Sequence, residues 1–233
     1  MELTAANALA AAISALVRDY DMVGTLSQLC DDCTEVLGGA ATGIMLTDGS
    51  GPLEMMAASS HRALEIDLYE IQSQEGPCIE ASQTGSIVIA GSADKIIARW
   101  PSFGPRAVAA GFPAAAACPL RWHGDAIGAL VVFFPEARAA GDDELRVAQA
   151  FADVATIAII ASGLPSANGL ARVTRRALAA RNVIEQAKGV IAAQTGYDMA
   201  ASYEHLRALA DASGQLLETF AQQLVNATAR PPL

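Results

Sequence analysis

Aromatic residues, cysteine and histidine are all scarce in this chain. Phe, Trp and Tyr together make up 5% of the sequence, whereas apolar residues as a whole make up 52% and alanine is abundant. We therefore expect a core that is closely packed from small side chains. The 4 cysteines, without an apparent secretory signal, favour the reducing environment of the cytoplasm.

Motifs typical of enzymes are missing. The 3 histidines, His61, His123 and His205, are far apart and fit neither the HExxH spacing of a zinc site nor a Ser/His/Asp arrangement. The sequence also has no GxxxxGKS or GxxxxGKT motif and no GxGxxG motif after a strand, which excludes the common nucleotide-binding loops. We therefore predict a protein that is not an enzyme and has no catalytic residues, no metal and no cofactor.

Long apolar runs and an excess of positive charge are absent too. The longest apolar runs, residues 108–120 and 127–134, are too short to span a bilayer, so we expect no membrane segment. The net charge of −10 argues against a protein that coats nucleic acid non-specifically. However, residues 1–170 contain 8 basic and 20 acidic residues, whereas residues 171–233 contain 7 and 5. The acidic charge therefore belongs to the first part of the chain.

The first 161 residues alternate between predicted helices and strands. Their strands favour two β-hairpins, with turns at residues 48–51 and 123–125. Hairpins separated and flanked by helices predict an α+β fold, with helices packed on an antiparallel sheet. In one of these helices Leu64, Leu68 and Ile71 are expected to lie on one side. Helices are expected at residues 3–20, 22–37, 64–74, 78–83, 93–110 (interrupted at Pro101 and Pro105) and 142–161, and strands at residues 41–47, 52–58, 86–90, 114–121 and 126–134.

Three further helices are predicted after residues 162–169, the only stretch with the composition of a linker. The first runs to Gln194 and ends at Gly196, which can take the left-handed conformation that stops a helix. Asp198 caps the second helix, and the third follows Gly214. We therefore predict a small all-α bundle after the sheet domain.

The first helix of this bundle has two faces with different expected roles. Arg181, Glu185 and Lys188 share one face at i, i+4, i+7 spacing and are expected to be solvated. On another face, small and branched residues recur at steps of four and three, which is typical of a seam for a second helix. Because three short helices cannot bury both faces of the first, we expect a homodimer through this seam. Its residues are Val173, Ala177, Ala180, Ile184, Ala187 and Ile191.

The C-terminal sequence resembles the ANTAR domain family. The strings IEQAKGV, SYEHLRALA and LLETFAQQLV carry the resemblance, which covers about residues 170–225. It implies a three-helix module with a coiled-coil lead-in that binds RNA and regulates transcription termination. Exposed Arg and Lys side chains on a rigid helix suit the phosphates of RNA hairpins, although a solvated helix face with internal ion pairs would look similar. The RNA-binding candidates are Arg175, Arg176, Arg181, Lys188 and Arg207.

The earlier part of the chain, about residues 20–160, resembles a GAF domain. The strings IMLTD, EGPCIEA, RWPSF, CPL and IGALVVF carry this resemblance. A GAF domain followed directly by an ANTAR domain is an arrangement of actinobacterial regulators. The resemblance implies a GAF-like domain at residues 1–161, a linker at residues 162–169 and an ANTAR domain at residues 170–233. GAF domains commonly form a small-molecule pocket, but the sequence does not name a ligand.

The cysteines leave one redox candidate. Cys30 and Cys33 form a CxxC pair, which we interpret as partly buried small residues because no second pair or nearby histidine completes a metal site. Cys78 lies near a predicted helix start, where the helix dipole would favour a thiolate. A redox role for Cys78 and a buried structural thiol both fit the sequence.

Two hypotheses of function follow from these observations. In the first, a GAF domain controls an ANTAR domain that binds hairpins in nascent RNA as a dimer and so prevents a terminator from forming. In the second, the protein is a sensor or scaffold that acts through protein contacts, and its helical bundle serves only dimerisation. The small positive charge of the C-terminal part keeps the second hypothesis open.

Overall fold

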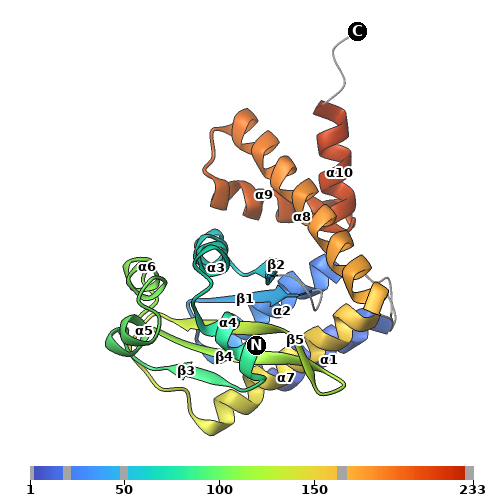
Figure 1. Cartoon of the computed structure of the whole chain (residues 1–233). Coiled ribbons are helices and arrows are strands. Elements are labelled where there is room, and N and C mark those ends of the chain that lie inside the picture. Colours follow the sequence, from blue (N-terminus) through green and yellow to red (C-terminus); the bar gives the residue numbers. More distant parts are fainter. Residues whose placement is uncertain (1–2, 18–21, 48–51, 162–166, 229–233) are drawn as a thin grey trace.

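The computed structural model describes residues 3–17, 22–47, 52–161 and 167–228, and side chains over most of these ranges. The first domain contains a sheet with flanking helices, and the last three helices form a bundle, as the sequence predicts (Figure 1). In chain order the elements are α1 Ala5–Val17, α2 Met22–Leu37, β1 Ala41–Leu46, β2 Glu54–Ala58, α3 His61–Ser73, α4 Pro77–Thr84, β3 Val88–Ala90, α5 Ala93–Arg99, α6 Gly104–Ala109, β4 Ala114–Trp122, β5 Asp125–Phe134, α7 Asp142–Ala161, α8 Ala167–Thr195, α9 Met199–Ser213 and α10 Leu217–Thr228.

The sheet has five strands in the order β2-β1-β5-β4-β3, and every neighbouring pair is antiparallel. The predicted hairpin of β4 and β5 is confirmed, with Trp122 opposite Asp125. His123 and Gly124 connect the strands with φ angles of 51° and 94°, and two positive φ angles suit the right-handed twist of a tight hairpin. β1 and β2 also pair as expected, whereas their predicted turn at residues 48–51 lies outside the described residues.

Helices cover both faces of the sheet (Figure 1). α1, α2 and α7 pack on one face, and α3 to α6 lie on the other. Successive side chains of a strand point to opposite faces of the sheet, so β4 contributes small residues to the cores on both faces. Ala114 and Ala116 belong to the core beneath α2 and α7, whereas Ala115 and Ala117 belong to the opposite core. These alanines therefore pack closely in the core.

The apolar side of α3 is not its most buried face. The structure buries Ala63, Ile66, Asp67 and Glu70, whereas Leu64, Leu68 and Ile71 are only partly buried. Apolar spacing does not mark the buried face here, because two carboxyl side chains occupy it. Leu64 instead points toward the C-terminal bundle.

Two smaller corrections concern the segment between the hairpins. The predicted strand at residues 86–90 is shortened to Val88–Ala90. Pro105 does not interrupt a helix, because it lies in the first turn of α6, where the missing N–H of proline costs no hydrogen bond. The predicted helix over residues 3–20 is α1, and its last expected residues lie outside the described ranges.

The predicted ends of the bundle helices are confirmed. Gly196 has a φ of 75° directly after α8, and its N–H donates to the carbonyl of Ala192 at 2.9 Å. Asp198 caps α9, because its Oδ1 accepts a hydrogen bond of 2.8 Å from the N–H of Ala201. Within the described part of the chain, no helix has both the length and the hydropathy that a bilayer span needs.

The bundle stands against the β2 edge of the sheet (Figure 1). α8 packs on β2 and α2, α10 also contacts α2, and α9 contacts α3. An uncovered edge strand presents unpaired backbone groups to solvent. In this structure α8 lies beside the edge strand β2. The first domain and the bundle therefore share an interface to which β2, α2 and α3 contribute.

Candidate nucleic-acid interface

The predicted dimer seam packs largely within the chain. Ile184, Ala187 and Ile191 are at most 5% exposed and belong to one buried cluster. The same cluster contains Leu206, Ala210, Leu217 and Ala221 of α9 and α10. This corrects the expectation that these three residues face a second chain, because their own bundle covers them. The side chains of Val173, Ala177 and Ala180 lie outside the described residues.

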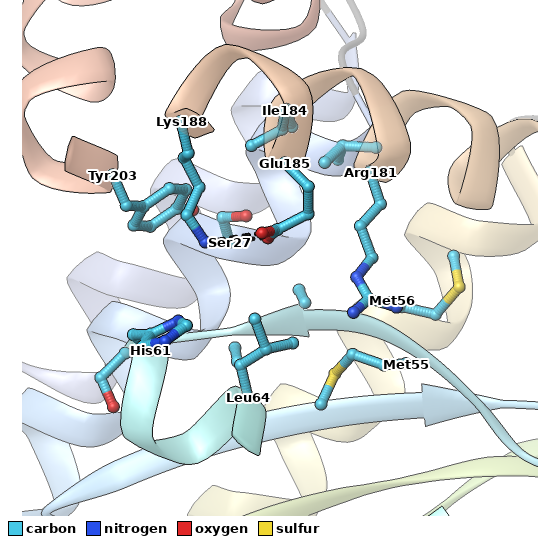
Figure 2. Close-up of a pocket in the computed structure, with 14 residues that line it drawn as sticks. Ser27, Met55, Met56, His61, Leu64, Arg181, Ile184, Glu185, Lys188 and Tyr203 are labelled. Carbon is cyan, nitrogen blue, oxygen red and sulfur yellow. Dashed lines mark hydrogen bonds and ion pairs between the residues drawn. The ribbon is translucent and has the colours of Figure 1, made fainter. Parts of the chain in front are cut away.

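Lys188 is not on a solvated face, which is a second correction. Its side chain is 2% exposed, and its Nζ lies 2.9 Å from both carboxylate oxygens of Glu185. Nζ also lies 5.5 Å from the ring centroid of Tyr203, within the range of a cation–π contact. Figure 2 shows the lysine pointing from α8 toward the first domain, between Glu185 and Tyr203. The first domain therefore covers the face that the sequence assigned to solvent.

Arg207 of α9 forms an ion pair with the first domain. Its Nη1 lies 2.6 Å from Oδ2 of Asp31 in α2, and both side chains are 25% exposed. Burial raises the pKa of the Asp31 carboxyl above its ordinary value, and the Arg207 charge opposes that rise. The guanidinium therefore favours the charged form of a partly desolvated aspartate. We call this contact the Asp31–Arg207 latch.

Tyr203 lies between the two cations. The Arg207 Cζ is 5.9 Å and the Lys188 Nζ is 5.5 Å from its ring centroid. Burial raises the pKa of the Tyr203 hydroxyl, and a hydrogen bond with the Ser27 side chain opposes the rise. In this conformation the ring is thus part of the interface, which fits the core interpretation better than an exposed surface for base stacking.

Arg181 is an RNA-binding candidate without an ion-pair partner among the described residues. It is partly exposed. Figure 2 shows it extending from α8 toward Met56 of β2. The side chains of Arg175 and Arg176 lie outside the described residues. Of the predicted set, the structure therefore gathers Arg181, Lys188 and Arg207 at the contact with the first domain.

The redox candidate Cys78 is a core residue. Its side chain is completely buried. Burial raises the pKa of its thiol well above the ordinary value, and the nearby Glu70 and Asp67 carboxyls raise it further. A raised pKa disfavours the reactive thiolate, so the position at the start of α4 does not activate this cysteine. Cys30, Cys33 and Cys118 are also free and buried, so the CxxC pair is more deeply buried than expected.

A buried carboxyl pair lies beneath α3. Oε1 of Glu70 accepts hydrogen bonds from the N–H groups of Cys78 at 2.6 Å and Ile79 at 2.9 Å, and so caps α4. Burial nevertheless raises the pKa of Glu70 to about 8. Asp67 is fully buried, and within the described part of the chain neither of its oxygens has a hydrogen-bond partner. Its pKa is raised by burial first and then by Glu70. Burial therefore favours the protonated form of both carboxyl groups.

The sequence does not predict the roles of three residues in the interface and the core. Asp31 stands between the two cysteines of the CxxC pair and gave no sign of a partner in the bundle. Asp67 and Glu70 looked like ordinary solvated charges on a helix. Only the spacing of three between the two carboxyls, beside a buried alanine and isoleucine, could have placed them on one face.

The arrangement defines an α+β sheet domain whose edge holds a helical bundle, with Arg181, Lys188 and Arg207 turned toward the contact. The chain belongs to the GAF domain family, because the family model described as a GAF domain matches residues 20–160, more than half of the chain. The model described as an ANTAR domain matches residues 172–225, which include Arg181, Lys188 and Arg207. A comparison with curated proteins gives no significant match.

Solved structures support the fold of the first domain. The phycocyanobilin-bound GAF domain of a cyanobacterial phytochrome has a TM-score of 0.54 at 14% identity, covering 68% of this chain and 95% of that one. The free methionine-R-sulfoxide reductase of Neisseria meningitidis, in complex with its substrate, has a TM-score of 0.52 at 18% identity, covering 68% and 89%. The GAF domain of an Acinetobacter phosphoenolpyruvate-protein phosphotransferase has a TM-score of 0.51 at 11% identity, covering 66% and 90%. At these identities the similarity concerns the fold alone.

Proposed function

We propose that the chain is an RNA-binding regulator in which the GAF domain controls whether the ANTAR bundle can bind hairpins in nascent RNA. Binding would hold the hairpins and prevent a terminator from forming, as the resemblance to the family implies. The observation that carries the proposal is the ANTAR match over residues 172–225. A nascent transcript as partner implies a cytoplasmic protein, and the proposal includes no catalytic step.

The chemistry of the bundle supports contact with RNA phosphates. Arg181, Lys188 and Arg207 come from α8 and α9, two helices that pack on each other. Arginine forms paired hydrogen bonds with phosphate oxygens, and lysine adds a point charge. Three such groups on a rigid bundle would grip the backbone of a hairpin, while its loop bases remain available for recognition.

The same contacts suggest how the GAF domain would exert control. Lys188 is 2% exposed, and Arg207 is held by the latch to Asp31. We therefore regard the described conformation as a closed, RNA-silent state. RNA binding would require an open state in which α8 and α9 leave the sheet edge, and a signal acts by changing the balance between the two states.

A homodimer remains part of the proposal, with a shorter seam than the full set of six residues. Ile184, Ala187 and Ile191 stabilise the bundle itself. A second chain would therefore pair along the earlier part of α8, through Val173, Ala177 and Ala180. In an open protein this lead-in would align two bundles on two successive hairpins.

A scaffold function is the second candidate, and one observation favours it. Lys188 and Arg207 form ion pairs inside the chain, so these two side chains could serve only to stabilise the fold. In that case the bundle would serve contacts between proteins, and RNA would have no specific effect on it.

A titration of the full chain with a fluorescent two-hairpin RNA tests the proposed function. The control is an RNA of equal length and composition whose stems cannot pair. We expect saturable binding of the two-hairpin RNA, at least about tenfold tighter than the control, and weaker binding as salt rises because phosphate contacts release counterions. Equal affinity for the two RNAs would overturn the RNA-binding proposal and favour the scaffold. Crosslinking the protein to cellular RNA, followed by sequencing, would identify the transcripts.

A further inference from the structure

A pocket lies between the two domains, at the edge of the sheet (Figure 2). Its cavity volume is about 50 Å³. A water molecule needs about 10–15 Å³ on the same measure, so this volume has room for about three to five water-sized groups. The pocket is partly open to solvent, so a slightly longer ligand can extend from its mouth. We call it the interdomain pocket. It differs from the core between the sheet and α4, which is filled by side chains.

One part of the interdomain pocket is apolar. The first domain contributes Met55 and Met56 of β2 and Leu64 of α3, and α8 contributes Ile184. Figure 2 shows Leu64 and the two methionines below α8, on the side of the sheet domain. Methionine adapts its shape readily, so this wall can accept a short apolar chain without a fixed outline.

The other part carries an excess of positive charge. Arg181, Lys188 and Glu185 line the pocket from α8. Glu185 neutralises Lys188 through the 2.9 Å contacts of its carboxylate. The Arg181 guanidinium has no carboxylate within ion-pair distance in the described part of the chain. A ligand with one negative charge would therefore balance the pocket.

His61 adds one ring nitrogen, Nδ1, that lacks a partner in the described part of the chain, whereas its Nε2 lies 3.5 Å from Oε1 of Glu65. It is the first residue of α3 and lines the interdomain pocket. Its Nδ1 is buried, and among the described residues no group forms a hydrogen bond with it. A ligand oxygen would accept a hydrogen bond from Nδ1 when that nitrogen carries a proton. The pocket also faces the N-terminal end of α3, where the helix dipole favours negative charge.

We propose that the interdomain pocket binds a small organic monocarboxylate, with its carboxylate toward Arg181 and His61 and its short apolar chain against Met55, Met56 and Leu64. Walls from both domains would touch this ligand at once. A ligand that fits only the assembled pocket stabilises the closed conformation by its differential affinity for the two states. On the proposed function, which this last step requires, the carboxylate would act as an inhibitor of RNA binding.

Butyrate is a suitable probe, and butyramide is its uncharged control of nearly the same shape. Binding to the full chain is measured by isothermal titration and saturation-transfer NMR, with sodium chloride holding the ionic strength equal in both series. We expect butyrate to bind with a Kd on the order of 1 mM, as suits about six non-hydrogen atoms. Butyramide should bind at least about tenfold more weakly because Arg181 then lacks its charge partner. Equal binding of the two probes, or no saturable binding of butyrate, would overturn the proposal.

Two variants locate the site. Arg181→Gln removes the unpaired cation from a partly exposed position and should weaken butyrate binding about tenfold. Arg62→Gln removes an exposed cation that lies one residue after His61 but does not line the pocket, and it should leave binding unchanged within twofold. Equal losses in the two variants would contradict the assignment of the pocket.

The effect on RNA separates this inference from the proposed function. At a butyrate concentration ten times its Kd, the Kd for two-hairpin RNA should rise about tenfold, whereas butyramide should have no effect. If butyrate binds but RNA affinity is unchanged, the ligand does not hold the closed state and that part of the proposal fails. If no hairpin RNA binds under any condition while butyrate still binds through Arg181, the proposed function fails and the ligand site stands.

Discussion

Asp31 of α2 and Arg207 of α9 connect the two domains through an ion pair in which Oδ2 and Nη1 lie 2.6 Å apart. The aspartate lies near the beginning of the chain and the arginine near its end. Each is three-quarters buried, so the pair is screened less than a surface salt bridge. A cation that the sequence assigns to RNA is thus held by the domain that is proposed to regulate it.

Lys188→Glu should destabilise the protein rather than act on RNA alone. The new carboxylate would lie beside Glu185 at a position that is 2% exposed, and burying a like-charge pair costs about 3 kcal/mol or more. Chemical denaturation measures this loss. Arg181→Glu makes the same charge change on the same helix at a partly exposed position and should cost less than about 1 kcal/mol. Equal stabilities of the two variants would contradict the buried placement of Lys188.

The stability of the first domain should fall as the pH rises toward 8. The pKa of Glu70 is about 8 in the folded chain instead of the ordinary 4.5, so the folded state keeps a proton that the unfolded state releases. This contribution to stability is complete below the ordinary pKa and is lost progressively up to the folded pKa. Urea unfolding between pH 5 and pH 8 should show a decrease on the order of a few kcal/mol, to which Asp67 contributes in the same direction.

Glu70→Gln should flatten this pH dependence, because the amide can still accept the two N–H groups of α4 but does not titrate. Glu136→Gln, at an exposed position, serves as the control and should keep the slope of the wild type. A wild-type stability that rises between pH 5 and pH 8 would contradict the protonated state of Glu70.

The four cysteines should resist thiol reagents in the native protein. All are free and buried, and burial raises the pKa of each thiol. Because the thiolate is the reacting species, 5,5′-dithiobis(2-nitrobenzoate) should label none of them quickly before unfolding and all 4 in denaturant. Fast labelling of Cys78 in the native protein would contradict its burial and support a redox role.

Glycine replacements should have opposite effects in the two domains. A Cβ at Gly43 in β1 would lie 1.9 Å from Oδ2 of Asp67, so Gly43→Ala forces the buried aspartate to move. We expect a loss of about 1–3 kcal/mol, which thermal or chemical denaturation would measure. Gly189 in α8 is exposed, and a Cβ there would have nothing within 4 Å. Gly189→Ala should therefore stabilise the bundle by up to about 1 kcal/mol, and a destabilisation would contradict this environment.

Much of the fold could be predicted because it depends on local signals. The helix expected over residues 142–161 has the observed bounds of α7, Asp142–Ala161. Gly196 gave the end of α8, and the β4–β5 hairpin followed from two apolar runs on either side of His123 and Gly124. These signals act over a few residues, and sequence spacing is sufficient to interpret them.

The site could be predicted only in part, because it depends on which surfaces meet. Spacing correctly grouped Arg181, Glu185 and Lys188 on one face of α8. It could not reveal that β2 and α2 cover this face, since a charged stripe looks the same beside solvent and beside another domain. Spacing likewise could not show that α9 and α10 cover Ile184, Ala187 and Ile191 of the expected dimer seam.

RNA affinity in two variants that break the same latch tests the central claim most directly. Asp31→Asn and Arg207→Gln each remove the interdomain ion pair, but only Asp31→Asn leaves the arginine free for RNA. In fluorescence anisotropy with two-hairpin RNA at fixed salt, Asp31→Asn should bind about three- to tenfold more tightly than the wild type. Arg207→Gln should bind no more tightly than the wild type. Equal affinities of the two variants, or tighter binding by Arg207→Gln, would contradict the account.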